Sequence, residues 1–162
     1  MIDKSVIVTG ASSGLGAHIT RHLVSQGARV VAGARRIDRL QALAMELAGA
    51  PGRLVVMEAD VTRAEDAERL AATAAEAHGG IDALVNNAGM EVQGAIEVLA
   101  EADLEAMLRT NVIGPFLCTR AALPWLKVRG GSVVNLGSTV VPRAPRNRFG
   151  YVGTKGAVEA MS

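Results

Sequence analysis

The sequence predicts an α/β fold in which helices cover both faces of a parallel β-sheet. Short apolar runs of strand length alternate with segments that repeat apolar residues at helical spacing. Hydrophobic residues make up 49% of the composition and aromatic residues only 2%, which indicates a core of Ala, Val, Leu and Ile. No linker, repeat or low-complexity segment interrupts the 162 residues, so we expect one doubly wound domain over residues 1–162.

The strands and helices follow from these runs and from the turn residues between them. Strands are expected at Ser5–Thr9, Ala28–Ala32, Leu54–Glu58, Ala83–Asn86 and Ser132–Leu136. Helices are expected at Leu15–Gln26, Arg36–Ala48, Arg63–His78, Glu101 to about Val128, and Tyr151–Ser162. The long fourth helix must accommodate Pro115 near its middle. A loop rich in Pro and Arg is expected before the last helix.

The composition argues against several classes of function. Lys plus Arg number 17 and Asp plus Glu number 16, so the net charge of +1 indicates no nucleic-acid partner and no anionic membrane surface. No secretory signal and no apolar stretch of membrane-spanning length is apparent, so we expect a cytoplasmic protein. The only cysteine, Cys118, lies beside Phe116 and Leu117, so we interpret it as a buried residue without a catalytic role.

A glycine-rich turn joins the first expected strand to the first expected helix. Its residues are Gly10, Ala11, Ser12, Ser13, Gly14, Leu15 and Gly16. Glycines let the backbone approach a pyrophosphate, and a helix N-terminus adds free N–H groups and a partial positive charge. In its setting of strand, turn and helix, the turn indicates a dinucleotide site, with an unliganded tight turn as the alternative.

Two arginines follow the second expected strand, where an NAD-selecting carboxylate would ordinarily stand. The segment from Ala32 to Arg36 contains no acidic residue, and Asp38 falls inside the next helix. The guanidinium groups of Arg35 and Arg36 suit a 2′-phosphate. We therefore predict NADP(H) in preference to NAD(H); the alternative is that both arginines only solvate the helix start.

Tyr151 and Lys155 stand four residues apart, so they share one face of the last expected helix. A free tyrosine has a pKa near 10, and a positive charge within about 4–6 Å lowers such a pKa. Ser138, thirteen residues before the tyrosine, could orient a carbonyl or alcohol. The set indicates proton transfer, although a Tyr and a Lys also occur at this spacing by chance on many helices.

Taken in order, these motifs resemble those of the short-chain dehydrogenase/reductase family. The matching residues are Thr9-Gly10-x3-Gly14-x-Gly16, Asp60, Asn86-Asn87-Ala88-Gly89, Asn111, Ser138 and Tyr151-x3-Lys155, and they span nearly the whole chain. The resemblance implies a Rossmann fold with the strand order 3-2-1-4-5. It also implies an oxidoreductase that transfers a hydride between nicotinamide and a small carbonyl or secondary alcohol, with NADP(H) as the cofactor that the two arginines favour.

The same resemblance implies roles for individual residues. Tyr151 would be the general acid and base, Ser138 would hydrogen-bond the substrate oxygen, and Lys155 would hold the nicotinamide ribose. Asn111 would maintain an irregularity in the long helix and hold a water in a proton relay toward Lys155. The implied cofactor contacts are Gly10, Ser12, Ser13, Gly14, Leu15, Gly16, Arg35, Arg36, Asp60, Val61, Asn87, Ala88, Gly89, Tyr151 and Lys155.

The family's sheet has two further strands after the last helix, whereas this sequence stops at Ser162. We therefore expect either a fragment of a longer protein or an apolar edge at the fifth strand that another chain covers. The resemblance implies a homo-oligomer, a dimer or tetramer, formed through the long helix and the last helix. The competing functional hypothesis is a nucleotide-binding or assembly module without catalysis.

Two further groups of side chains have weaker functional interpretations. His18 and His22 lie four residues apart on the first helix, but no third ligand is apparent, so no metal site is predicted. Three arginines cluster between Ser138 and Tyr151, namely Arg143, Arg146 and Arg148. They could attract an acidic or phosphopantetheine-linked acyl substrate, but a solvated basic loop is the simpler interpretation.

Overall fold

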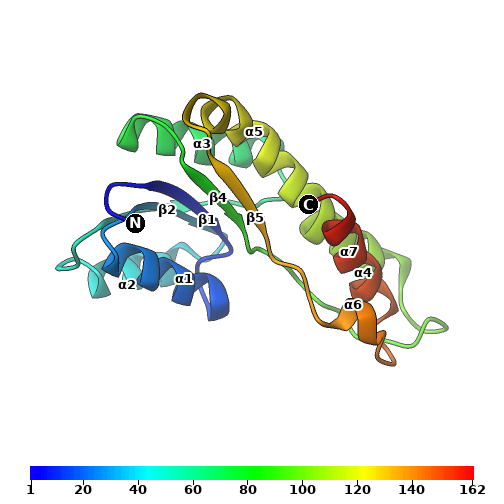
Figure 1. Ribbon diagram of the computed structural model, residues 1–162. Helices are drawn as coiled ribbons and strands as arrows, with labels where there is room; N and C mark the ends of the chain where they lie inside the picture. The colour runs from blue at the N-terminus through cyan, green and yellow to red at the C-terminus, as the bar shows by residue number, and fades with distance from the viewer.

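The computed structural model describes all 162 residues and contains a five-stranded parallel sheet (Figure 1). The strands are β1 (Ser5–Thr9), β2 (Arg29–Ala34), β3 (Arg53–Glu58), β4 (Ala83–Asn86) and β5 (Ser132–Asn135). They pair in the order β3-β2-β1-β4-β5, with every pair parallel. This is the Rossmann arrangement, and the predicted strand order is confirmed.

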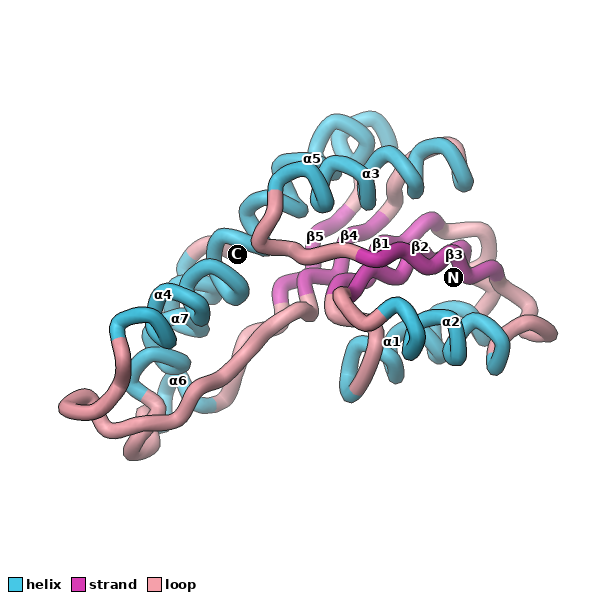
Figure 2. Tube along the Cα trace, turned by 180° about the vertical axis from the view of Figure 1, so that it is seen from behind, coloured by secondary structure: helices cyan, strands magenta, loops and turns pink.

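Helices form a layer on each face of the sheet. They are α1 (Gly14–Ser25), α2 (Ile37–Glu46), α3 (Ala64–His78), α4 (Glu101–Leu108), the π-helical η1 (Arg109–Ile113), α5 (Gly114–Arg129), α6 (Val140–Arg143) and α7 (Phe149–Ala160). One face is covered by α1 and α2 and the other by α3 and α5, as Figure 2 shows. Beyond the β5 side of the sheet, α7 packs against α4 and η1, with α6 beside it. None of these helices has both the length and the apolar composition needed to cross a membrane.

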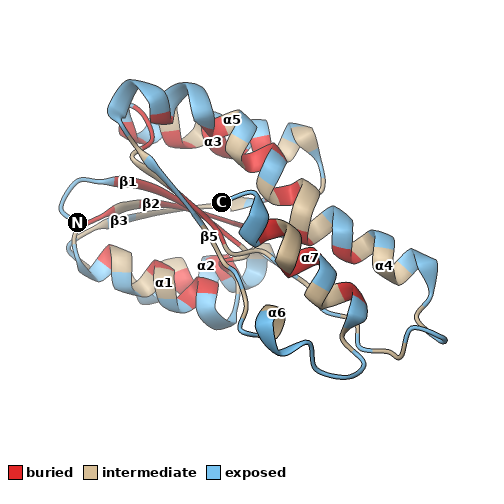
Figure 3. Cartoon of the chain, turned by 45° about the vertical axis from the view of Figure 1, so that its right-hand side comes forward, coloured by how far each residue is buried: buried red, intermediate tan, exposed pale blue.

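The core lies in two parts, one on each side of the sheet. In β1, Val6 and Val8 point toward the cluster under α1 and α2, whereas Ile7 points toward the cluster under α3 and α5. Side chains alternate in this way because successive residues of a strand face opposite sides. All five residues of β1 are buried, which suits a central strand with helices on both faces (Figure 3).

The long helix expected from Glu101 onward is interrupted by a π-helical turn. α4 ends at Leu108, η1 follows, and α5 begins at Gly114. Pro115 is the second residue of α5, just after the π-helical turn. Its missing N–H therefore leaves a gap in the helical hydrogen bonding next to a turn that is already irregular. The proline is therefore accommodated by a change of hydrogen bonding and not by a break in the helix path.

The segment expected as a loop before the last helix differs from the prediction. It contains the short helix α6, and α7 begins at Phe149, two residues earlier than expected. A four-residue helix made largely of Val, Pro and Arg carries no apolar repeat, which explains why periodicity did not reveal it.

His78 is a buried titratable side chain at the amino-terminal end of the sheet. It is 5% exposed, its Nδ1 lies 3.0 Å from Ser5 Oγ, and its Nε2 has no hydrogen-bond partner. Burial, followed by the charges of Arg29 and Arg53, lowers the pKa of the His78 imidazole below its usual 6.5. Burial thus favours the neutral form of this ring in the folded protein.

We expect acid to destabilise the protein through His78. Below about pH 6.5 the unfolded imidazole takes up a proton before the folded one does, so the free energy of unfolding falls as pH decreases. His78→Gln should remove this contribution. The fall in Tm between about pH 7.5 and pH 5 should then be a few degrees smaller in the variant than in wild type. Circular dichroism melts test this, with His22→Gln on the exposed side of α1 as the matched control. Parallel pH curves for wild type and His78→Gln would contradict the assignment.

Candidate active site

The glycine-rich turn packs directly against the segment that follows β4. Gly10 has a φ of 65°, and a Cβ placed on it would lie 2.7 Å from Ala88 Cα. A Cβ on Gly16 would collide with the Gly10 carbonyl oxygen and with Asn87 Nδ2. Side chains are therefore excluded from both positions, which brings the turn, the start of α1 and the β4 loop into one cradle.

Thr9 and Asn87 hold this cradle together. The backbone N–H groups of Asn87 and Ala88 each donate to Thr9 Oγ1 at 3.1 Å. In return, Asn87 Nδ2 donates to the carbonyl oxygens of Thr9 at 2.8 Å and Gly10 at 3.2 Å. These reciprocal bonds fix the ends of β1 and β4 relative to each other, at the edge where parallel α/β sheets bind ligands.

A cavity of about 440 Å³ opens over this cradle. It is lined by Gly10, Ser12, Ser13, Leu15, Gly16, Ala34, Arg35, Arg36, Ala59, Asp60, Val61, Asn87, Ala88, Gly89, Met90 and Thr110. The cavity thus brings together all the predicted cofactor contacts except Gly14, Tyr151 and Lys155. Four lining residues were missed by sequence reasoning, namely Ala34, Ala59, Met90 and Thr110. Each of the four is next in sequence to a predicted site residue, and this adjacency could have indicated it as a lining residue.

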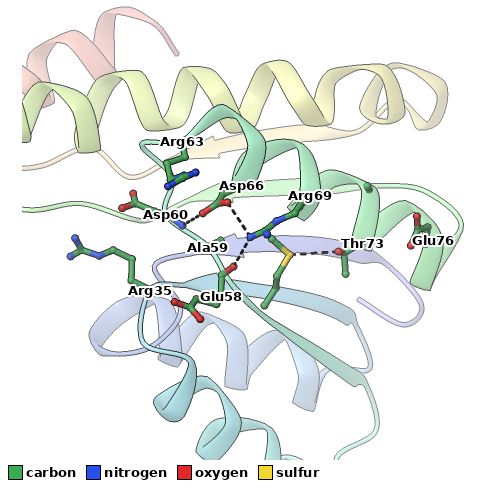
Figure 4. A pocket seen from close by; sticks show the side chains of 11 residues that line it. Arg35, Glu58, Ala59, Asp60, Arg63, Asp66, Arg69, Thr73 and Glu76 are labelled. Carbon is green, nitrogen blue, oxygen red and sulfur yellow. Dashed lines mark hydrogen bonds and ion pairs between the residues drawn. The ribbon is translucent and has the colours of Figure 1, made fainter.

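The two arginines after β2 have different surroundings. Arg36 Nη2 donates to Ser12 Oγ at 3.1 Å and to Ser13 Oγ at 2.7 Å, so its guanidinium lies over the glycine-rich turn. Arg35 has no hydrogen-bond or ion-pair partner and also lines a second, open cavity of about 970 Å³. Figure 4 shows Arg35 and Asp60 at one end of this second cavity, with Thr73 and Glu76 at the other. Arg35 therefore keeps all its donors available where the two cavities meet.

Asp60 is oriented by its own turn. Its Oδ1 accepts from Thr62 N at 2.9 Å, and its backbone N–H donates to Asp66 Oδ2 at 2.8 Å. Asp66 in turn forms an ion pair with Arg69 at 3.0 Å. This network anchors the segment between β3 and α3, and it places Asp60 and Val61 in the wall of the smaller cavity.

Asn111 lies in the π-helical turn and is only 1% exposed. Its Oδ1 accepts from Met90 N at 2.8 Å, and its Nδ2 donates to Met90 O at 2.9 Å and to Thr154 Oγ1 at 3.0 Å. Thr154 Oγ1 in turn donates to the backbone carbonyl of Tyr151 at 2.8 Å. The Asn111 side chain therefore ties the β4 loop to α7 and has no N–H left for another partner.

Lys155 is buried where the ends of β4 and β5 meet α7. Its Nζ donates to Leu136 O at 2.6 Å and lies 5.9 Å from the centroid of the Tyr151 ring. A Cβ on Gly89, which lines the cavity, would lie 3.9 Å from the same nitrogen. Burial lowers the pKa of the Lys155 ammonium group. The structure thus brings Lys155, Tyr151 and the cavity wall together.

Ser138 lies between β5 and α6, at the neighbouring strand end. Its Oγ accepts from Val140 N at 3.3 Å and makes no hydrogen bond with Tyr151. Because the Ser138 hydroxyl only accepts in this weak contact, its O–H remains free to donate to another group.

The remaining candidates lie away from this site or have other partners. His18 and His22 are exposed on α1. Cys118 is 4% exposed, as expected for a buried residue, and burial raises the pKa of its thiol to about 12. Among the three loop arginines, Arg148 forms an ion pair with Glu91 at 3.2 Å, whereas Arg143 and Arg146 are exposed and unpaired.

Known proteins resemble this chain in both sequence and fold. A family model described as short chain dehydrogenase matches residues 4–162. An uncharacterized oxidoreductase of Methylorubrum extorquens is 37% identical over 160 residues, which cover 98% of this chain and 64% of the relative. L-fucose dehydrogenase of Bos taurus is 38% identical over 161 residues, which cover 98% of this chain and 58% of that enzyme. The chain thus spans less than two thirds of the length of these curated relatives.

A solved structure shows the same likeness in three dimensions. The X-ray structure of an alcohol dehydrogenase from the archaeon Thermococcus sibiricus, complexed with 5-hydroxy-NADP, matches with a TM-score of 0.93 at 34% sequence identity. The match covers 98% of this chain and 68% of that one.

Proposed function

The chain belongs to the short-chain dehydrogenase family, and on that premise we propose that it is the nucleotide-binding and proton-transfer part of an NADP(H)-dependent oxidoreductase. Its substrate would be a small carbonyl compound or secondary alcohol. The observation that supports this most is that Gly89, in the wall of the cavity, also adjoins Lys155 and Asn111. A nucleotide in the cavity would therefore extend toward α7, the helix that carries Tyr151.

The residues present fit a dinucleotide. Gly10 and Gly16 allow the turn to pack closely against Asn87 and Ala88, and Leu15 and Gly16, at the N-terminus of α1, line the cavity. Arg36, held by two serine hydroxyls, and the unpaired Arg35 would receive a 2′-phosphate. The relative that was solved with 5-hydroxy-NADP is consistent with this assignment. When bound, the nicotinamide would supply or accept the hydride.

The proton would be handled by side chains of this chain. In reduction, the Tyr151 hydroxyl would donate its proton to the substrate oxygen, and in oxidation the same oxygen would accept it. The Lys155 ammonium would stabilise negative charge on that tyrosine, and the Ser138 hydroxyl would hydrogen-bond the substrate oxygen. These roles agree with the position of Lys155 between Gly89 and the Tyr151 ring.

Asn111 would act through its backbone. Its carboxamide is occupied by Met90 and Thr154, so it would hold the π-helical turn in place. The ordinary helical donor to the Asn111 carbonyl would be the N–H of residue 115, and Pro115 has none. That carbonyl could accept from a water in a relay toward Lys155.

The second candidate is a nucleotide-binding or assembly module that does not catalyse. It is favoured by β5, an edge strand on which Val133 and Val134 are 36% and 49% exposed. Exposed apolar strand edges are ready to pair with another chain.

NADPH titration and NADPH oxidation, measured on the same preparation, distinguish the two candidates. Binding together with oxidation in the presence of a ketone from a broad panel supports the enzyme. Binding without turnover for any ketone or secondary alcohol favours the module. If neither NADPH nor NADP⁺ binds, the enzyme and a nucleotide-binding module are both ruled out, and only an assembly role remains.

The preference for the phosphorylated cofactor depends on Arg35 and Arg36. We expect the double variant Arg35→Ala/Arg36→Ala to bind NADPH about 10- to 100-fold more weakly, because hydrogen bonds to charged groups contribute about 1.5–3 kcal/mol. The affinity for NADH should stay nearly unchanged. Fluorescence titrations measure both, with Arg39→Ala, an exposed arginine on α2 without a partner, as the matched control. Equal affinity of the wild-type chain for NADH and NADPH would disprove the preference.

A further inference from the structure

The loop that follows β4 is joined to the start of α7 by an ion pair and by backbone contacts. Glu91 Oε1 lies 3.2 Å from Arg148 Nε, with side chains 27% and 33% exposed respectively. Three residues further along the loop, Gly94 N donates to Asn147 O at 2.8 Å, and Gly94 forms an isolated parallel bridge with Arg148. Two segments more than fifty residues apart in sequence therefore run side by side here.

Each partner of the ion pair adjoins a part of the proposed active site. Glu91 comes two residues after Gly89, which lines the nucleotide cavity. Arg148 is the N-cap residue of α7, its carbonyl accepts from Val152 N at 2.8 Å, and Tyr151 lies within the same first turn. The ion pair consequently joins the wall of the cavity to the turn that carries Tyr151.

Other contacts hold α7 from different directions. A Cβ on Gly150 would lie 3.2 Å from Leu104 Cδ1, so the first turn of α7 rests closely on α4. One turn further along, Thr154 is held by Asn111. No other ion pair involves the β4 loop or α7, so Glu91 and Arg148 provide the only charged connection between them.

We propose that Glu91 and Arg148 form a positioning pair that sets the place of Tyr151 relative to the nucleotide cavity. This inference rests on the proposed function, in which Tyr151 transfers the proton. Proton and hydride transfer to one carbonyl require both donors at defined distances, and a misplacement of about 1 Å can lower the rate about 10²-fold. The pair is partly exposed, so it should matter more for the position of Tyr151 than for global stability.

The test compares Glu91→Gln, Arg148→Gln and the charge exchange Glu91→Arg/Arg148→Glu. Glu97→Gln is the matched control, because Glu97 lies exposed in the same loop without a partner. Each single variant should lower kcat about 3- to 10-fold with the KM for NADPH within about twofold, because positioning affects the transition state and leaves cofactor binding intact. The exchange should restore at least half of the lost kcat, and the control should match wild type.

A spectroscopic readout makes the test independent of turnover. Tyr151 is the only tyrosine, so a chain with ¹³C-labelled tyrosine gives ring signals from this residue alone. Those signals should move in both single variants and return toward the wild-type position in the exchange. Salt of about 1 M should shift the wild-type signals in the same direction as the single substitutions do. At that concentration the screening length is about 3 Å, so the attraction between the two exposed charges is weakened. The salt comparison needs no substitution and therefore no assumption about the folding of variants.

The outcomes separate this inference from the proposed function. Unchanged Tyr151 signals in both single variants, or an exchange that restores neither kcat nor the signals, would overturn the positioning pair. A wild-type chain that binds NADPH without turnover would instead count against the proposed function. In that case the Tyr151 signals still decide whether the pair positions the tyrosine.

Discussion

Replacing Tyr151 with phenylalanine is expected to abolish oxidation of NADPH by a carbonyl substrate while the affinity for NADPH stays nearly unchanged. The substitution removes one hydroxyl and keeps the ring, so the packing of α7 against α4 and η1 should persist. General acid–base catalysis by a positioned side chain contributes about 10²–10⁴-fold to a rate. No second tyrosine is present to replace the lost group.

The measurement is kcat/KM for the substrate beside an NADPH titration of the same variant. Wild type and Glu97→Gln serve as references, and circular dichroism confirms that the variant is folded. Retained turnover in Tyr151→Phe would show that another group supplies the proton. A loss of NADPH binding together with activity would show that the substitution damages the site as a whole.

Gly16→Ala is expected to weaken nucleotide binding more than about tenfold and to destabilise the fold. The new Cβ would collide with the Gly10 carbonyl oxygen and with Asn87 Nδ2, and it would lie 2.9 Å from the Gly10 carbonyl carbon. The backbone of the turn cannot yield without losing the bonds that Asn87 donates to Thr9 and Gly10. Overpacking of this kind costs about 1–3 kcal/mol, and here the distortion falls in the cradle where we propose that the nucleotide binds.

Gly14→Ala is the informative comparison, because the same methyl group meets nothing within 4 Å there. Gly14 has a φ of 53°, so alanine would cost only the left-handed strain of about 1–2 kcal/mol. NADPH titrations and thermal melts should show a loss of affinity of more than about tenfold for Gly16→Ala and a smaller loss for Gly14→Ala. Equal affinities in the two variants would contradict a cradle that depends on Gly16.

Much of the fold and of the candidate site could be predicted because the relevant signals are local. The continuous apolar run Val6–Val8 indicates a strand buried on both faces, as the two core clusters confirm, and spacing alone places Tyr151 and Lys155 on one side of a helix. The glycine-rich turn is recognisable because its glycines stand at a strand end directly before a helix. The strand order came from the family resemblance, since periodicity does not say which strands are neighbours.

Other features depend on contacts between distant segments. The preference of Arg36 for the two serine hydroxyls, while Arg35 stays unpaired, cannot be read from two adjacent arginines. The bond from Lys155 to Leu136 O and the pair of Glu91 with Arg148 join residues far apart in sequence. The short helix α6 was missed because four residues are too few for a periodic pattern.

The sequence by itself therefore determined the layers of the fold, the glycine-rich turn and the residue types proposed for proton transfer. Each of these depends on neighbours within about one helical turn or one strand. Only the tertiary structure decided how Asn111 and Lys155 are held against the cavity wall, with the Tyr151 ring near Lys155. Asn111 illustrates the physical reason: a buried carboxamide must satisfy its donors and acceptor, and its partners Met90 and Thr154 become neighbours only when the β4 loop and α7 pack around the π-helical turn.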